Sequence, residues 1–156
     1  MEIIDLLSGA KASKPPTQGR GRLNKTQARW RIIQTHKAKP AMSSIQRIGD
    51  SPRWSDVVIH NGVAQWVEVA NDMSVDARSQ IAQVLQQIDD TLKQIGSSRE
   101  RLLQILIYLA DLEHGPTLNE LWDAWVPRGH APIRACVQVG LGKNCLVEMI
   151  ITAAAP

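Results

Sequence analysis

The sequence predicts an α+β fold in which a mixed β-sheet carries two helices on one face. Two runs rich in β-branched residues, Arg53–His60 and Val63–Val69, are separated only by Asn61-Gly62, a pair typical of a two-residue hairpin turn. The stretch Ile81–Ile95 repeats its apolar residues with a helical period. Leu102–Ala110 is almost continuously apolar, as expected of a central strand that is covered on both faces.

Length and composition indicate one globular domain. The chain has 156 residues, of which 44% are hydrophobic and 21% are charged. No apolar run approaches membrane-spanning length, and the first residues do not form a secretory signal. The two cysteines, Cys136 and Cys145, are too few for a disulfide framework or a four-thiolate zinc site. We therefore expect a cytoplasmic protein.

The first 41 residues differ from the rest in charge and composition. Residues 1–41 hold nine Lys or Arg and two acidic residues, a net charge of +7, whereas residues 42–156 sum to −4. Apart from a possible short helix at Thr26–Gln34, this segment reads as a loop or as disorder. It fits a nucleic-acid-binding tail, an organelle-targeting segment, or a stretch that precedes a natural start at Met42. We favour the last interpretation, with residues 42–156 as the folded domain.

The first helix is predicted from one apolar stripe and its two ends. Ser74 is a plausible N-cap, and Asp76 then lies in the first turn, where the helix dipole favours an acidic side chain. Gly96 stands where a left-handed C-terminal cap is expected. The stripe consists of Ile81, Val84, Leu85, Ile88, Leu92 and Ile95.

A second helix and two further strands are predicted after Leu102–Ala110. The helix runs from about Pro116 to Val126, and Pro127 ends it. The strands Arg134–Val139 and Leu146–Thr152 are joined by a connection short enough for a hairpin, and Ile45–Ile48 is a candidate additional strand. The buried stripe of the helix is expected to contain Leu118, Leu121, Trp122 and Trp125.

This arrangement leaves one sheet face without a cover. The helices occupy the first face, while apolar residues from several strands lie on the second, and the chain has no further element to place there. We therefore expect a homo-oligomer, with sites possible where subunits meet.

Arg134 and Glu148 are the candidates for chemistry. No motif for binding metals or phosphate groups is present, and His60, His114 and His130 are isolated near the ends of predicted elements. Arg134 and Glu148 each interrupt an otherwise apolar strand, which is costly for a charged side chain. One interpretation is a structural ion pair across the final hairpin. The other is that Arg134 binds an anionic ligand through its planar fork while Glu148 positions a water molecule.

These residues fall within a wider resemblance. RWSDVVIHN (Arg53–Asn61), IYLAD (Ile107–Asp111) and LNELWDAWVPRGHAP (Leu118–Pro132) resemble the YjgF/Rid family, also described as RutC-like or endoribonuclease L-PSP proteins, and most closely its YoaB-like branch. So do the amphipathic helix that ends in Gly96 and the strands that hold Arg134 and Glu148. The resemblance extends from about Ser44 to Ala155.

The resemblance implies a chorismate-mutase-like fold and a homotrimer with ligand clefts between its subunits. It also implies hydrolysis of reactive 2-imino or enamino acids, such as 2-iminopropionate and 2-aminoacrylate, to 2-keto acids and ammonia, with no cofactor and no metal. By position, Arg134 would hold the substrate carboxylate and Glu148 would orient the attacking water. The pocket would further be lined by Cys136, which shares a strand face with Arg134, and by Asn119 and Trp54.

Two departures from the family pattern bear on catalysis. Glu68 stands where the family usually has a glycine whose backbone approaches the ligand, so its side chain could fill the cleft, repel an anion or pair with Arg134. The interval from Arg134 to Glu148 is also one residue shorter than usual. A non-catalytic trimer that binds small carboxylates is therefore the alternative function. An RNA-acting protein is a further alternative, which residues 1–41 favour and the acidic domain opposes.

Overall fold

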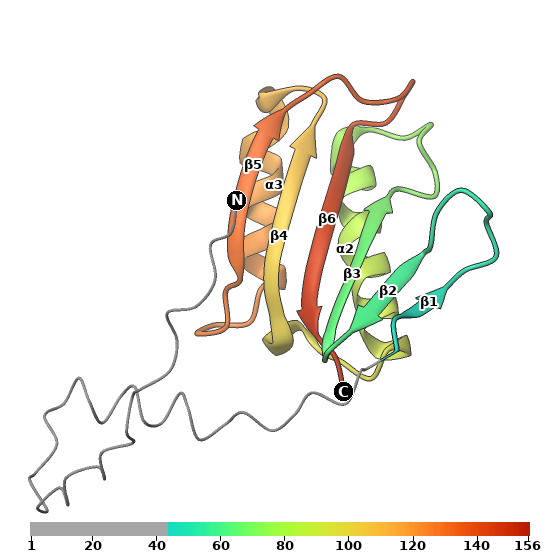
Figure 1. Cartoon of the computed structure of the whole chain (residues 1–156). Coiled ribbons are helices and arrows are strands. Elements are labelled where there is room, and N and C mark those ends of the chain that lie inside the picture. The colour runs from blue at the N-terminus through green and yellow to red at the C-terminus, as the bar shows by residue number, and fades with distance from the viewer. Residues whose placement is uncertain (1–43) are drawn as a thin grey trace, which may run out of the picture. The chain divides into compact units, whose positions relative to one another are not determined.

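The computed structural model describes residues 44–156, which form a six-stranded mixed sheet with both long helices on one face (Figure 1). This confirms the predicted fold class. The expected helix at Thr26–Gln34 and the proposed start at Met42 lie outside the described residues. The strand order is β1-β2-β3-β6-β4-β5, in which only β4 and β5 are parallel. The elements are β1 Gln46–Ile48, β2 Val57–His60, β3 Val63–Val69, α2 Ala77–Gln94, η1 Arg99–Arg101, β4 Leu102–Leu109, η2 Leu112–His114, α3 Gly115–Trp125, β5 Ile133–Gln138 and β6 Val147–Ala154.

The first hairpin forms where the sequence predicted it. Strands β2 and β3 pair antiparallel through a turn at Asn61 and Gly62, whose φ angles are 51° and 73°. Two consecutive positive φ angles are the requirement of a type I′ turn, which is why an Asn-Gly pair occupies it. The predicted first strand is shorter than expected, because residues 53–56 precede the strand that begins at Val57. The additional strand is present as β1 and pairs with β2.

Helix α2 begins two residues later than the expected cap implied. Asp76, not Ser74, is the N-cap, and its carboxylate accepts a hydrogen bond of 2.7 Å from the backbone N–H of Ser79. The Ser74 hydroxyl instead donates to Asp72 within the preceding turn. At the other end Gly96 has a φ of 69°, and the two N–H groups after the helix return to its last turn as in a Schellman motif.

The C-terminal half of the sheet differs from the expected topology. Strands β5 and β6 do not form a hairpin, because β4 lies between them and pairs with both. The chain passes from β4 through α3 to β5, which places β5 parallel to β4 at the sheet edge (Figure 1). The later connection then returns β6 to the centre, between β4 and β3.

The core lies between the sheet and the helices. Ile81 and Ile88 of α2 and Leu118 of α3 are fully buried against Ile105 and Met149 of the sheet. The opposite sheet face is open in the single chain. There Val67, Leu103 and Val137 are 51%, 44% and 48% exposed. Strand β4 is therefore covered on one face only, contrary to the expectation from its composition.

One polar side chain is fully buried in this core. Gln80 of α2 donates to the carbonyls of Met73, Val75 and Asn144 at 3.3, 3.0 and 2.9 Å. Its own carbonyl accepts from the backbone N–H of Leu146 at 2.9 Å. Gln80 therefore fastens two loops to the helix, one before α2 and one before β6. Along residues 44–156, no helix is both long enough and apolar enough to cross a membrane.

Candidate functional site

Arg134 lies on the edge strand β5, on the face that the helices cover. Its register partner on β4 is Ile105, which is fully buried in the core, so Arg134 points toward α3. There its Nη1 donates a hydrogen bond of 2.9 Å to the side-chain carbonyl of Asn119. The guanidinium also lies 4.8 Å from the ring centroid of Trp122, one turn further along α3. The two helix residues hold the guanidinium from one side.

The Arg134 guanidinium has no anionic partner within the described domain. The two ion pairs found across residues 44–156 join Arg78 to Glu120 and Arg99 to Asp89. The Nε atom of Arg134 is buried and makes no hydrogen bond to a described residue. A guanidinium that is positioned but not neutralised is suited to binding a carboxylate.

Cys136 shares the face of Arg134, as the sequence predicted. Its register partner Ile107 is a core residue, and the half-buried thiol packs against the same core. Burial raises the pKa of the Cys136 thiol, and the charge of Arg134 opposes that effect in part. A neutral thiol at ordinary pH suits a side chain that lines a pocket rather than a nucleophile.

Glu148 lies on the other face of the sheet, which contradicts the ion pair expected across a final hairpin. Its neighbours Val147 and Met149 are fully buried on the helix side, so Glu148 points to the open face, next to its β4 partner Tyr108. A hollow of about 370 Å³ lies there, lined by Glu148, Tyr108 and the loop that contains Gly140 and Gly142. In one chain, Glu148 and Arg134 therefore cannot act on the same small molecule.

Trp54 and Glu68 line a third region, a groove of about 600 Å³ that we call the Trp54–Glu68 groove. Glu68 lies on the helix face of β3 and is half-buried. Its two carboxylate oxygens accept hydrogen bonds from Gln87 at 3.0 Å and from Thr91 at 2.9 Å, both on α2. Glu68 does not pair with Arg134 within the chain. The groove is lined by Ile48, Trp54, Ser55, Asp56, Val57, Val67, Glu68, Val69, Thr91 and Gln94.

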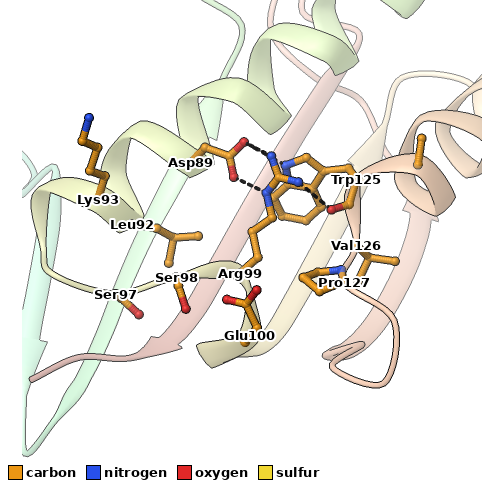
Figure 2. Close-up of a pocket in the computed structure, with 11 residues that line it drawn as sticks. Asp89, Leu92, Lys93, Ser97, Ser98, Arg99, Glu100, Trp125, Val126 and Pro127 are labelled. Atoms are coloured by element: carbon orange, nitrogen blue, oxygen red, sulfur yellow. Dashed lines mark hydrogen bonds and ion pairs between the residues drawn. The ribbon is translucent and has the colours of Figure 1, made fainter.

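Sequence reasoning missed a hollow of about 540 Å³ between α2, η1 and the end of α3 (Figure 2). Arg99 makes three hydrogen bonds there. Its Nε and Nη2 donate to the Asp89 carboxylate at 2.6 and 2.5 Å, and its Nη1 donates to the backbone carbonyl of Trp125 at 2.8 Å. The Trp125 indole N–H also donates to Asp89. These groups satisfy one another, so they tie three elements together. No spacing rule links residues so far apart in the sequence.

Trp122 is the functional neighbour that the sequence placed only in the core. The residue is 5% exposed and belongs to the buried stripe of α3, yet its ring also lies against the Arg134 guanidinium. The available signal was the three-residue spacing of Asn119 and Trp122, which puts both on one helix face.

Comparison with known proteins gives the same family from sequence and from structure. The family model described as Endoribonuclease L-PSP matches residues 44–155. The RutC family protein YoaB of Escherichia coli is 44% identical over 112 residues, which cover 71% of this chain and 98% of that protein. A RutC family protein of Haemophilus influenzae is 37% identical over 113 residues, covering 70% of this chain and 97% of its own length.

Two solved structures show the same fold at comparable identity. A protein from Pseudomonas aeruginosa superposes with a TM-score of 0.70 at 36% identity, covering 72% of this chain and 100% of its own. A YjgF-family protein from Neisseria meningitidis has a TM-score of 0.69 at 36% identity and covers 74% of this chain and 98% of its own.

Proposed function

The chain belongs to the Endoribonuclease L-PSP family, which includes the YjgF and RutC proteins, and from this premise we propose that it is an enamine/imine deaminase. Its substrates would be 2-imino or enamino acids of the 2-iminopropionate and 2-aminoacrylate type. Its products would be 2-keto acids and ammonia, formed in a reducing cytoplasm. No cofactor is required, because the carbon of a protonated imine is already electrophilic.

The observation that carries this proposal is the state of Arg134. Its guanidinium rests on Trp122, donates to the neutral Asn119 and faces no carboxylate among the described residues. A substrate carboxylate bound by the remaining N–H groups would be held in a fixed orientation by two parallel hydrogen bonds. Holding the carboxylate in this way would fix the orientation of the imine carbon, which favours the addition of water.

The chemistry needs one water molecule and a group that moves protons between oxygen and nitrogen. Water adds to the imine carbon and loses a proton, which gives a carbinolamine. The nitrogen then takes up a proton and leaves as ammonia, while the carbinolamine hydroxyl loses its proton and becomes the keto group. Glu148 would accept a proton from the attacking water, and Cys136 would line the pocket beside Arg134. Asn119 positions the guanidinium and does not itself react.

We propose that the complete site forms between subunits of a homotrimer. Arg134 and Glu148 lie on opposite faces of the sheet, so a second copy of the chain must bring a Glu148 to an Arg134. The open sheet face, with Val67, Leu103 and Val137 exposed, offers the apolar surface that such an assembly would bury.

A non-catalytic trimer that binds small carboxylates is the second candidate, and Glu68 favours it. This carboxylate, held by Gln87 and Thr91, stands where the family usually has glycine. Its negative charge would disfavour the small anionic substrates of the deaminase, so Glu68 counts against catalysis and leaves Arg134 as the group that binds a carboxylate.

Imine hydrolysis by the full chain tests the proposal. An amino-acid oxidase would generate 2-iminopropionate, and competition with semicarbazide would report its lifetime. The parent should shorten that lifetime, whereas Arg134→Ala should lose about a hundredfold or more in kcat/KM, the loss expected when a charged hydrogen-bonded pair is not made. Arg128→Ala, an exposed arginine in the loop before β5, is the matched control and should behave like the parent. A folded parent that does not accelerate imine loss would refute the deaminase and leave the binding trimer.

Mixing subunits tests the shared site. Arg134→Ala and Glu148→Gln chains, each inactive alone, should regain about one quarter of the parent rate when refolded together at equal amounts, since each mixed trimer holds one intact pair. If mixing restores no activity, the two residues do not meet between subunits.

A further inference from the structure

We propose that the Trp54–Glu68 groove binds a cation, and that the substrate of this chain is a 2-imino acid whose side chain ends in a guanidinium or ammonium group. The imino acid part of this inference rests on the proposed function, whereas the cation part rests on the groove alone. It gives Glu68, the residue that departs from the family pattern, a role in substrate selection.

The charge of the groove is the first argument. Among its ten lining residues, the charged ones are Glu68 and Asp56, and none is a lysine or an arginine. The groove is therefore negative and its walls do not neutralise it. A cavity lined by one sign of charge concentrates ligands of the opposite sign.

The state of the Glu68 carboxylate is the second argument. Each of its oxygens accepts one hydrogen bond from a neutral side chain of α2, from Gln87 or from Thr91. Neither ion pair found within residues 44–156 includes it. A half-buried carboxylate that is held in place but not neutralised is costly on its own, and a bound cation removes that cost.

Trp54 supplies the third argument. This residue is 61% exposed, which is unusual for a tryptophan, and it lines the same groove as Glu68. The guanidinium of Arg53 lies 5.9 Å from the centroid of the Trp54 ring, so the ring already contacts one cation of the chain, which a ligand cation would join or displace. A carboxylate and an indole ring in one groove match the two contacts that a guanidinium makes best.

Within one chain Arg134, on the edge strand β5, and the groove beside β3 lie apart. One substrate can meet both only where the proposed trimer brings the Arg134 of one subunit to the groove of the next, and the two groups then set opposite demands on its two ends. Arg134 selects a carboxylate, whereas Glu68 repels one. A substrate with a carboxylate at one end and a cation at the other satisfies both groups. A small anion such as 2-iminopropionate satisfies Arg134 only, so it should be a poorer substrate.

The discriminating experiment compares two imino acids of nearly equal size. The imines of L-arginine and L-citrulline, generated by an amino-acid oxidase, differ in having a charged guanidinium or a neutral urea at the end. The parent protein should favour the arginine-derived imine by about tenfold in kcat/KM, and Glu68→Gln should remove the preference. Glu100→Gln, which changes an exposed carboxylate outside the groove, should preserve it. Equal rates in the parent, or an undiminished preference in Glu68→Gln, would overturn the inference.

A binding measurement separates this inference from the proposed reaction. Calorimetric titration with n-butylguanidinium and with neutral n-butylurea should show binding of the cation only, weakened about tenfold in Glu68→Gln. If the cation binds in this way while no imine is hydrolysed, the deaminase fails and the cation site stands. If the guanidinium does not bind, or binds Glu68→Gln as tightly as the parent, the cation site is refuted. A gain in affinity for simple carboxylates in Glu68→Gln would then assign Glu68 to excluding anions or to pairing with Arg134.

Discussion

Replacing Gln80 with leucine should destabilise the domain without changing its surface. Leucine occupies nearly the same volume, so the packing around the fully buried position is kept while the amide is lost. The Leu146 N–H then loses its acceptor, and the carbonyls of Val75 and Asn144 lose their donor. The perturbation therefore acts through hydrogen bonds rather than through a cavity.

The size of the effect follows from which groups water can reach. Asn144 is exposed, so solvent can replace the amide there, whereas Val75 and Leu146 are half-buried. A buried polar group left without a partner costs about 1–3 kcal/mol. Taking the lower part of that range for Val75 and Leu146, the free energy of unfolding should fall by about 2–4 kcal/mol.

Urea unfolding followed by tryptophan fluorescence measures this loss. At a fixed protein concentration, the midpoint of Gln80→Leu should fall by about 1–2 M with an unchanged slope. Gln86→Leu is the matched control, because Gln86 lies exposed on the same helix and donates only to Asp90. If Gln80→Leu unfolds at the urea concentration of the parent, the two loops do not depend on Gln80 and the reasoning fails.

Two further predictions concern titrating groups. Hydrogen bonds from Ser79 hold the pKa of Asp76 below its ordinary value, so its contribution to stability is present above about pH 4 and is lost as the pH falls through the lowered pKa. Asp76→Asn keeps a capping oxygen without a titrating group, so the stability gap between parent and variant should change between pH 7 and pH 3; a constant gap would contradict the capping role. Burial raises the pKa of Cys136 against the opposing charge of Arg134. In a Cys145→Ser background, the pH dependence of alkylation should give a Cys136 pKa above that of free cysteine. Adding Arg134→Ala should raise this pKa further. If Arg134→Ala lowers the pKa of Cys136 instead, Arg134 does not act on the thiol as described.

The local elements of the fold were predictable because short-range signals determine them. Asn61 and Gly62 adopt the positive φ angles that their turn requires, and Gly96 closes α2 as its position indicated. The N-cap was misplaced because Ser74 and Asp76 are both good caps, and the choice depends on which side chain reaches Ser79. Strand order was not predictable in the same way, because the connection between β5 and β6 is short enough for a hairpin. The pairing of β5 with β4 depends on α3 packing against the sheet.

The same distinction holds for the candidate site: contacts set by local spacing were predictable, and those set by strand order were not. Alternation along a strand correctly placed Cys136 with Arg134, and helix spacing was sufficient to place Asn119 near Trp122. The pairing of Arg134 with Glu148 was wrong because it assumed that their strands are neighbours. With β4 between them, the two side chains fall on opposite faces of the sheet.

The central position of β6 determines when the domain can fold during synthesis. Strand β6 leaves the ribosome after the other described elements, yet it lies between β3 and β4 and joins the two halves of the sheet. Until its eight residues emerge, both β3 and β4 present an unpaired edge, which is a hazard for aggregation. A nascent chain therefore exposes both edges until β6 has emerged, and loss of β6 would separate β1-β2-β3 from β4-β5 instead of leaving a smaller continuous sheet.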